Sequence, residues 1–145
     1  MGGSNGGLLV GAAMTQRPEL FEAVVCQVPL LDMLRYHLLL AGASWIAEYG
    51  DPSIPNEYDY IQRYSPYQNL KRDIQYPNSY FFTTTKDDRV HPGHARKMVA
   101  KLSEYKQNVT YYENSEGGHG AGADSLQQSK TRTYQLIYLF QQLMD

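Results

Sequence analysis

Three stretches rich in β-branched, aromatic and aliphatic residues recur along the chain, separated by more polar segments. Residues 23–28 form a continuous β-favouring run, which is typical of a central parallel strand covered on both faces. Residues 79–85 combine aromatic and β-branched side chains and give the clearest strand prediction. Residues 108–112 predict a third strand of similar composition.

Helical patterns alternate with these strands. Residues 8–16 are small and apolar and are followed by the helix breaker Pro18. Pro92 fits the first position of a helix that extends to about residue 105. The last predicted helix covers residues 125–144, where apolar residues fall near helical spacing. These apolar residues are Leu136, Tyr138, Leu139 and Leu143.

The segment between the first two strands is harder to interpret. Residues 31–40 are compatible with a helix, and residues 58–64 predict a short one. Residues 42–58 contain Gly, Pro and Asn at intervals and predict a loop. The alternation of strands and helices around this insertion indicates an α/β fold with a mostly parallel sheet covered by helices.

Composition narrows the class of protein. The chain has 145 residues, of which 42% are hydrophobic and 19% charged, so we expect one globular domain with a real core. A formal net charge of −2 gives no reason to expect nucleic acid or an anionic membrane as a partner. No run of about 18 apolar residues is present, so no membrane span is expected. Cys26 is the only cysteine, so no internal disulfide can form.

The first residues contain the pattern Gly-x-Ser-x-Gly, with Gly2, Ser4 and Gly6. This pattern is typical of a nucleophile elbow, in which a serine sits on a strained turn between a strand and a helix. The following helix would direct its free N–H groups at the serine, and the N–H of Asn5 is the expected first oxyanion donor. By itself the pattern fits a glycine-rich surface loop equally well.

The residues that follow strengthen the catalytic interpretation. A nucleophilic serine needs a histidine base, and the histidine needs a carboxylate that fixes its tautomer. In α/β hydrolases these residues occur in the order Ser, acid, His. Asp87 follows one predicted strand and His119 follows the next, so both order and placement fit Ser4, Asp87 and His119 as a triad. The residues alone leave Asp88 open as the acid.

Other ligand-binding interpretations are weaker. His91 and His94 are three residues apart, but no third or fourth metal ligand accompanies them, so surface or capping roles are expected. His37 lies in an apolar stretch and is interpreted as structural. The first loop lacks the Gly-Lys-Ser/Thr that a phosphate-binding loop needs, because Gly7 is followed by two leucines.

Longer motifs resemble a known family. They are residues 2–10 (GGSNGGLLV), 16–21 (QRPELF), 32–37 (DMLRYH), 45–50 (WIAEYG), 64–69 (YSPYQN), 87–90 (DDRV) and 118–122 (GHGAG). Together they are similar, in order and over essentially the whole chain, to the catalytic domain of the prolyl oligopeptidase family. The resemblance implies the C-terminal part of an α/β-hydrolase domain over residues 1–145.

The resemblance also implies roles. Ser4 would be the nucleophile, His119 the base and Asp87 the acid. Arg89 would hydrogen-bond the substrate backbone beside the cleaved proline. Trp45 would stack on the proline ring, in a pocket that Tyr49, Val28, Leu30 and Val90 also line. The implied reaction is hydrolysis of short peptides after proline through an acyl-enzyme, without a metal or organic cofactor.

Only three residues precede Ser4, whereas the family has further strands, a second oxyanion donor and a β-propeller before it. We therefore expect the strand that delivers the elbow to be absent and this chain alone to be a fragment with weak or no activity. Loss of one oxyanion donor lowers turnover by about 100–1,000-fold. An unpaired sheet edge would also favour self-association.

Two alternatives remain. The first is another hydrolase of the same fold, such as an esterase or a dipeptidyl- or acylaminoacyl-peptidase. The second is a non-catalytic remnant that acts as an interaction module. The expected compartment is the cytoplasm, with the periplasm left open because the native N-terminus can lie outside this sequence.

Overall fold

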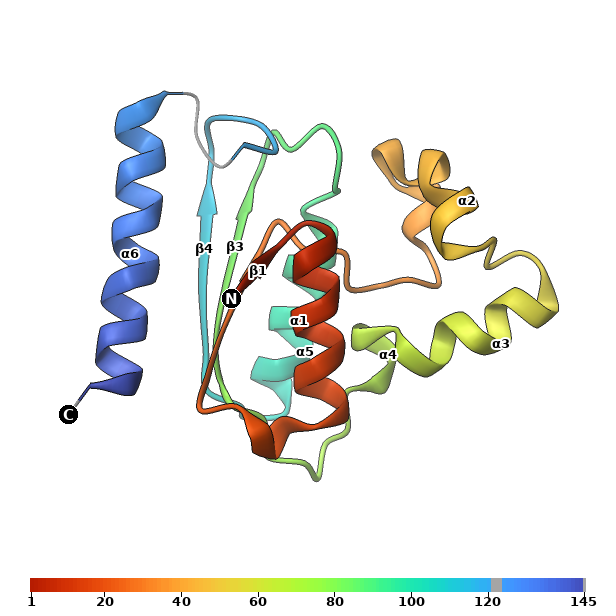
Figure 1. Ribbon diagram of the computed structural model, residues 1–145, viewed down its shortest axis with the longest axis horizontal. Coiled ribbons are helices and arrows are strands. Elements are labelled where there is room, and N and C mark those ends of the chain that lie inside the picture. Colours follow the sequence, from red (N-terminus) through yellow and green to blue (C-terminus); the bar gives the residue numbers. More distant parts are fainter. Residues whose placement is uncertain (121–123, 145) are drawn as a thin grey trace.

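The computed structural model describes residues 1–120 and 124–144 and contains one parallel sheet with helices on both of its faces (Figure 1). The strands are β1 (Gly2–Gly3), β2 (Ala23–Gln27), β3 (Asn78–Thr84) and β4 (Val109–Asn114). The helices are α1 (Asn5–Gln16), α2 (Ile46–Tyr49), α3 (Pro55–Tyr64), α4 (Pro66–Asn69), α5 (Gly93–Glu104) and α6 (Ser125–Leu143). The predicted α/β class, its three strands and its first and last helices are confirmed.

The strands lie in the sheet in the same order as in the sequence, β1-β2-β3-β4, and every neighbouring pair is parallel. The β2–β3 register places Val24 opposite Ser79 and Cys26 opposite Phe81. Because all four strands point the same way, their carboxyl ends meet at one edge of the sheet. Side chains that follow β1, β3 and β4 are therefore brought toward the same edge.

Two apolar clusters fill the two faces of the sheet. Alternate strand residues Val24, Cys26 and Phe81 pack with Met14 of α1 and Met98 of α5. The intervening residues Val25, Tyr80 and Phe82 pack with Tyr138 of α6. Figure 1 shows the corresponding arrangement, with α1 and α5 on one side of the sheet and α6 on the other. Burial on both faces explains why residues 23–28 lack an alternating polar pattern.

Cys26 lies in the first of these clusters and is fully buried. Its Sγ donates to the carbonyl oxygen of Gly7, at 3.2 Å, across the contact between α1 and β2. Burial raises the pKa of this thiol to about 12, because the thiolate would lose its hydration.

The strand before the elbow, expected to be absent, is represented by two paired residues. Gly2 pairs with Cys26 and Gly3 pairs with Gln27 in β1. The expectation was wrong at this point because two glycines carry no strand propensity, and only pairing with β2 makes them extended.

The segment between β2 and β3 also differs from the prediction. Residues 42–58, predicted as loop, include part of a 3₁₀ helix at Leu40–Trp45, all of α2 and the start of α3 at Pro55. Residues 31–40 do not form an α-helix, and only a 3₁₀ turn at Tyr36–Leu38 lies wholly within them. The backbone N–H of Met33 donates instead to Ser65 Oγ, at 2.9 Å. Tertiary partners therefore outweigh local propensity in this segment.

His94 is the buried residue that organises the start of this segment, so a surface role is ruled out. Its side chain is only 2% exposed, and Nδ1 accepts hydrogen bonds from the backbone N–H groups of Leu31, at 3.3 Å, and Asp32, at 3.0 Å. It therefore caps backbone of another segment rather than of its own helix. Burial, only partly opposed by the nearby Asp32 carboxylate, lowers the pKa of His94 to about 4.

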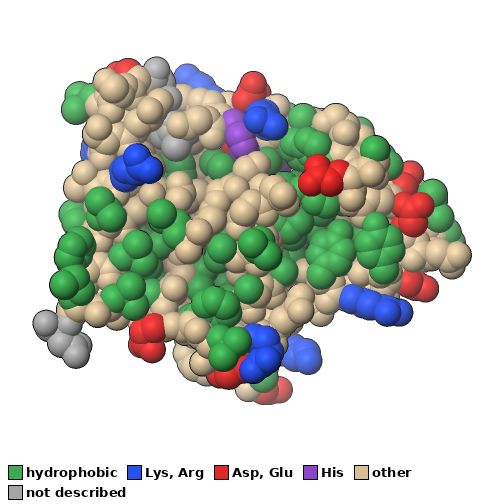
Figure 2. All heavy atoms as spheres, in the orientation of Figure 1, with side chains coloured by type: hydrophobic (Ala, Val, Ile, Leu, Met, Phe, Trp, Pro, Cys, Tyr) green, Lys and Arg blue, Asp and Glu red, His purple; other side chains and the backbone are tan. Residues whose placement is uncertain are grey.

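The C-terminal half of α6 exposes a group of apolar side chains. Leu136, Ile137, Phe140 and Leu143 are all exposed, whereas Tyr138 is buried against the sheet. Figure 2 shows hydrophobic side chains gathered over this helix. Among the described residues, no helix is long and apolar enough to cross a membrane.

The buried His94 predicts a pH-dependent stability. Its folded pKa of about 4 lies below the ordinary value of 6.5, so the stabilisation is full above pH 6.5 and is lost as pH falls toward 4. The free energy of unfolding should fall by up to about 1 kcal/mol per pH unit in this window from this group alone. Urea unfolding of the wild-type chain and of His94→Asn measures the two slopes. The variant should be less stable at pH 7 and show a flatter dependence, and equal slopes would contradict the role of His94.

Candidate active site

Ser4 occupies a strained turn between β1 and α1. Its φ of 56° and ψ of −118° lie in a region that non-glycine residues rarely adopt. The Ser4 backbone N–H donates to Gln27 O at 2.9 Å, and Ser4 O accepts from the N–H of Leu8 at 3.1 Å. A Cβ at Gly2 would lie 2.2 Å from the carbonyl oxygen of Gly6, so a side chain there would collide with the following helix. This is the geometry that the glycine pattern predicts.

Asp87 and His119 form a buried contact at the same edge of the sheet. His119 Nδ1 lies 2.8 Å from Asp87 Oδ2 and 3.0 Å from Oδ1. Asp87 is only 4% exposed, and its Oδ1 also accepts the backbone N–H groups of Arg89 and Val90, each at 2.9 Å. An ionised carboxylate only accepts hydrogen bonds, so Nδ1 carries the proton and Nε2 is left as an acceptor.

The structure distinguishes the two adjacent aspartates, which the sequence pattern did not. Asp88 is exposed, whereas Asp87 is buried and contacts the imidazole. The loop of His119 is held close to β3, because Thr84 Oγ1 donates to Gly118 O at 3.0 Å. Residues 121–122 of the glycine-rich motif lie outside the described residues. Within the described part of the chain, the hydrogen bonds do not include one between Ser4 and His119.

Asn5, the expected oxyanion donor, begins α1 directly after Ser4. Its side chain makes a contact that the sequence gave no signal for. The Tyr49 hydroxyl donates to Asn5 Oδ1 at 2.8 Å, across 44 positions of the chain. Burial raises the pKa of Tyr49 to about 12, so its hydroxyl stays protonated and able to donate at neutral pH. This bond links α2, which follows Trp45, to the first turn of α1.

Most of the predicted pocket residues lie together. Leu30 and Val90 belong to one buried apolar cluster, and Trp45 and Tyr49 pack against it. Val28 does not join them. It packs on the opposite face of the sheet with Phe82 and Tyr138, although it is only two residues from Leu30. The backbone turns sharply here, since Val28 has a φ of 37° and its N–H donates to Phe82 O at 2.7 Å.

Arg89 lies between Asp87 and Val90, and its side chain is exposed. Its backbone N–H is fixed by Asp87 Oδ1, so the guanidinium projects from an anchored turn. Groups of three or more His, Cys, Asp or Glu that could hold a metal ion are not found within residues 1–120 and 124–144.

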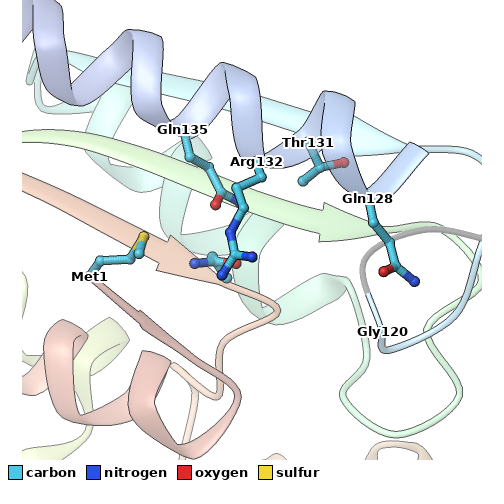
Figure 3. Close-up of a pocket in the computed structure, with 7 residues that line it drawn as sticks. Met1, Gly120, Gln128, Thr131, Arg132 and Gln135 are labelled. Atoms are coloured by element: carbon cyan, nitrogen blue, oxygen red, sulfur yellow. The ribbon is translucent and has the colours of Figure 1, made fainter. Parts of the chain in front are cut away.

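A polar cavity of about 240 Å³ lies between the N-terminus and α6 (Figure 3). Gln27 and Gly120 connect its lining to the backbone around Ser4 and His119, because Gln27 O accepts from Ser4 N and Gly120 follows His119. The remaining lining comes from Met1 and from Gln128, Thr131, Arg132 and Gln135 of α6. The Gln135 amide nitrogen is buried without a hydrogen-bond partner. This cavity is separate from the apolar cluster around Trp45.

Comparison with known proteins identifies the family. A sequence model described as the prolyl oligopeptidase family matches residues 1–145. The chain belongs to the prolyl oligopeptidase family. The resemblance inferred from the sequence motifs is confirmed, and the family places the sheet and helices within an α/β-hydrolase catalytic domain.

Individual relatives agree with this assignment. The chain is 52% identical over 145 residues to an uncharacterized peptidase, y4nA, of Sinorhizobium fredii, covering all of this chain and 20% of that protein. It is 41% identical over 127 residues to a prolyl endopeptidase of Dictyostelium discoideum, covering 83% of this chain and 17% of that protein. A solved post-proline cleaving enzyme from Rickettsia typhi superposes with a TM-score of 0.95 at 43% identity. That match covers 98% of this chain and 21% of the enzyme, so the chain spans about a fifth of the length of these relatives.

The contrast between Asp87 and Asp88 yields a test. Asp87→Asn should slow covalent labelling of Ser4 by a fluorophosphonate by a factor on the order of 100 or more, because the imidazole loses the carboxylate that holds its tautomer. Asp88→Asn is the matched control and should stay within about twofold, because its carboxylate is exposed and, among the described residues, makes no hydrogen bond to Ser4 or His119. Labelling rates measured at equal protein concentration decide the point. Equal slowing by both variants would contradict the proposal that Asp87, rather than Asp88, holds the His119 imidazole.

Proposed function

We propose that this chain carries the nucleophile, acid and base of a serine endopeptidase that cleaves short peptides on the carboxyl side of proline. The observation that carries the proposal is the buried contact between His119 Nδ1 and Asp87, at the sheet edge where Ser4 occupies a strained turn. Strain at a single non-glycine residue between a strand and a helix is characteristic of a nucleophile held for attack.

In the proposed reaction, Ser4 Oγ attacks the carbonyl carbon of the scissile bond while His119 Nε2 takes its proton. Asp87 accepts the hydrogen bond from Nδ1–H throughout, without taking the proton, and stabilises the imidazolium that forms. The negative charge on the carbonyl oxygen would be held by the N–H of Asn5, at the positive end of α1. His119 then returns its proton to the leaving amine as the acyl-enzyme forms.

Hydrolysis of the acyl-enzyme would use the same groups in reverse order. His119 removes a proton from water, the hydroxide attacks the acyl carbon, and the proton returns to Ser4 as the new carboxylate leaves. In each step His119 acts as the base through Nε2, and the Asp87 carboxylate holds the imidazole in place. No metal or organic cofactor takes part in the proposed reaction.

The proposed preference for proline rests on the apolar cluster and on the relatives. Trp45 offers a flat aromatic face beside Leu30 and Val90, which suits a rigid apolar ring. Arg89 would hydrogen-bond the peptide backbone next to that ring. The Dictyostelium discoideum relative is named a prolyl endopeptidase, and the Rickettsia typhi structure is titled a post-proline cleaving enzyme.

We further propose that residues 1–145 form a partial peptidase domain with weak or no activity by itself. The described contacts join Asp87 to His119 but leave Ser4 without a hydrogen bond to His119. Ala23, Val24 and Val25 pair with β3, and β1 pairs only with Cys26 and Gln27 of β2. A partly unpaired strand of this kind can template self-association.

The partly unpaired β2 also suits a second candidate function, that of an interaction module. A non-catalytic remnant would keep the fold, associate through its open strand and leave Ser4 unreactive. Other hydrolases of this fold, including esterases and dipeptidyl- or acylaminoacyl-peptidases, share the triad. Unlike the proposed proline-specific endopeptidase, these enzymes would not need the aromatic face of Trp45 to bind a substrate.

Labelling with a fluorophosphonate separates the catalytic from the non-catalytic proposal. The folded wild-type chain should label at Ser4, more slowly than a complete serine peptidase, and Ser4→Ala should abolish the labelling. Mass spectrometry of the labelled peptide identifies the residue, and size-exclusion chromatography reports the oligomer that carries it. A folded chain that does not label would support the non-catalytic remnant.

Trp45 provides the test of substrate preference. Two peptidyl phosphonates that differ only in having proline or alanine before the phosphorus react once with Ser4. Their labelling rates can therefore be compared without catalytic turnover. Trp45→Ala should lower the proline-to-alanine rate ratio by about tenfold, whereas Trp45→Phe should preserve most of it. An unchanged ratio in Trp45→Ala would favour a hydrolase with a different specificity.

A further inference from the structure

A second cavity, of about 260 Å³, lies between the segment after β2 and the first turns of α5. Its lining includes Arg35, Leu38, His91, His94 and Lys97, and it shares no residue with the proposed triad or with its apolar pocket. The proposed peptidase reaction gives this cavity no role.

His94 supplies a hydrogen-bond donor that the fold does not use. Its Nδ1 accepts two backbone N–H groups, from Leu31 and Asp32, so the neutral ring must carry its proton on Nε2. Among the described residues, Nε2 has no hydrogen-bond partner, although the side chain is only 2% exposed. Nε2 is not one of the atoms that are buried without a partner, so it is open to the cavity and can donate to an acceptor that enters it.

The charges around the cavity favour a negatively charged acceptor. Asp32 is the one carboxylate in the lining, and it is already engaged by Lys97 and by the Gln68 amide at 2.6 Å. Arg35 lies farther from Asp32, at 3.7 Å between Nε and Oδ2, and its side chain is 61% exposed. Its planar guanidinium therefore retains donors for a second carboxylate.

The remaining wall is apolar. Leu38 and Leu39 line the cavity, and Leu38 is 72% exposed, which is a large apolar surface beside a charged group. A ligand with an apolar tail would cover this surface while its head group reaches His94 and Arg35. A phosphate or sulfate could satisfy the donors but would leave the leucines exposed to water.

We propose that this cavity binds a small carboxylate with a short apolar tail, its oxygens accepting from His94 Nε2 and from the Arg35 guanidinium. Such a group can be a free short-chain acid or the terminal carboxylate of a peptide that ends in an apolar residue. The site is separate from the serine peptidase site and does not depend on Ser4.

The test titrates the purified chain with butyrate at neutral pH while the imidazole nitrogen NMR signals of His94 are followed. Without ligand, these signals should report a neutral ring protonated on Nε2, and butyrate should shift them saturably at millimolar concentrations. Butyramide, the neutral analogue, should bind at least about tenfold more weakly because it lacks the charge that Arg35 recognises. N-acetyl-leucine is the second arm, and its tighter binding would identify a peptide terminus as the source, whereas tighter butyrate binding would identify a free acid.

Arg35→Gln is the discriminating variant, because replacing His94 would also release the backbone at Leu31 and Asp32. It should weaken butyrate binding by about threefold to tenfold, while Arg63→Gln, a matched change on exposed α3, should leave the dissociation constant unchanged. The proposal is overturned by absence of a saturable shift, by equal binding of butyramide, by tighter binding of inorganic phosphate, or by equal effects of the two variants. Failure of Ser4 to label would leave it standing, so its outcome is independent of the peptidase proposal.

Discussion

One backbone hydrogen bond, from Ser4 N to Gln27 O, is the constraint on which the proposed site depends. It continues the short β1–β2 pairing by one residue and holds Ser4 where the chain leaves the sheet with a positive φ and enters α1. The strain of such a residue is of order 1–3 kcal/mol and persists only where its surroundings determine the turn. Here those surroundings are the two residue pairs between β1 and β2 and the close approach of Gly2 to Gly6.

The sheet and the order of the proposed catalytic residues could be predicted because both depend on local patterns. Residues 23–28 and 79–85 are long β-favouring runs. The positions of Asp87 and His119 could be predicted because Asp87 comes after β3 and His119 comes after β4. The choice between Asp87 and Asp88 could not be made from local pattern, because two adjacent carboxylates differ only in burial. Asp87 is buried in contact with His119 and the backbone N–H groups of Arg89 and Val90, whereas Asp88 is exposed.

The parts that could not be predicted depend on contacts between distant segments. His94 resembles a surface residue at a helix start, yet it bonds backbone groups 62 and 63 positions away. Val28 and Leu30 are apolar neighbours, but the positive φ at Val28 sends them to different clusters. The bond between Tyr49 and Asn5 likewise joins two segments that share no sequence signal. In each case the contacts are set by the tertiary structure, and the local sequence does not predict them.

Alkylation of the fully buried Cys26 can measure local opening of the folded chain. A thiol reacts with alkylating reagents through its thiolate, and both burial and the raised pKa withhold that form in the folded state. Cys26 lies where α1 and α5 meet the sheet, so reagent reaches it only when that layer separates. Because it is the only cysteine, the alkylation rate of the whole chain is the opening rate or opening equilibrium of that single layer. The cohesion of the sheet that supports Ser4 can thus be followed chemically, independently of any reaction at the serine.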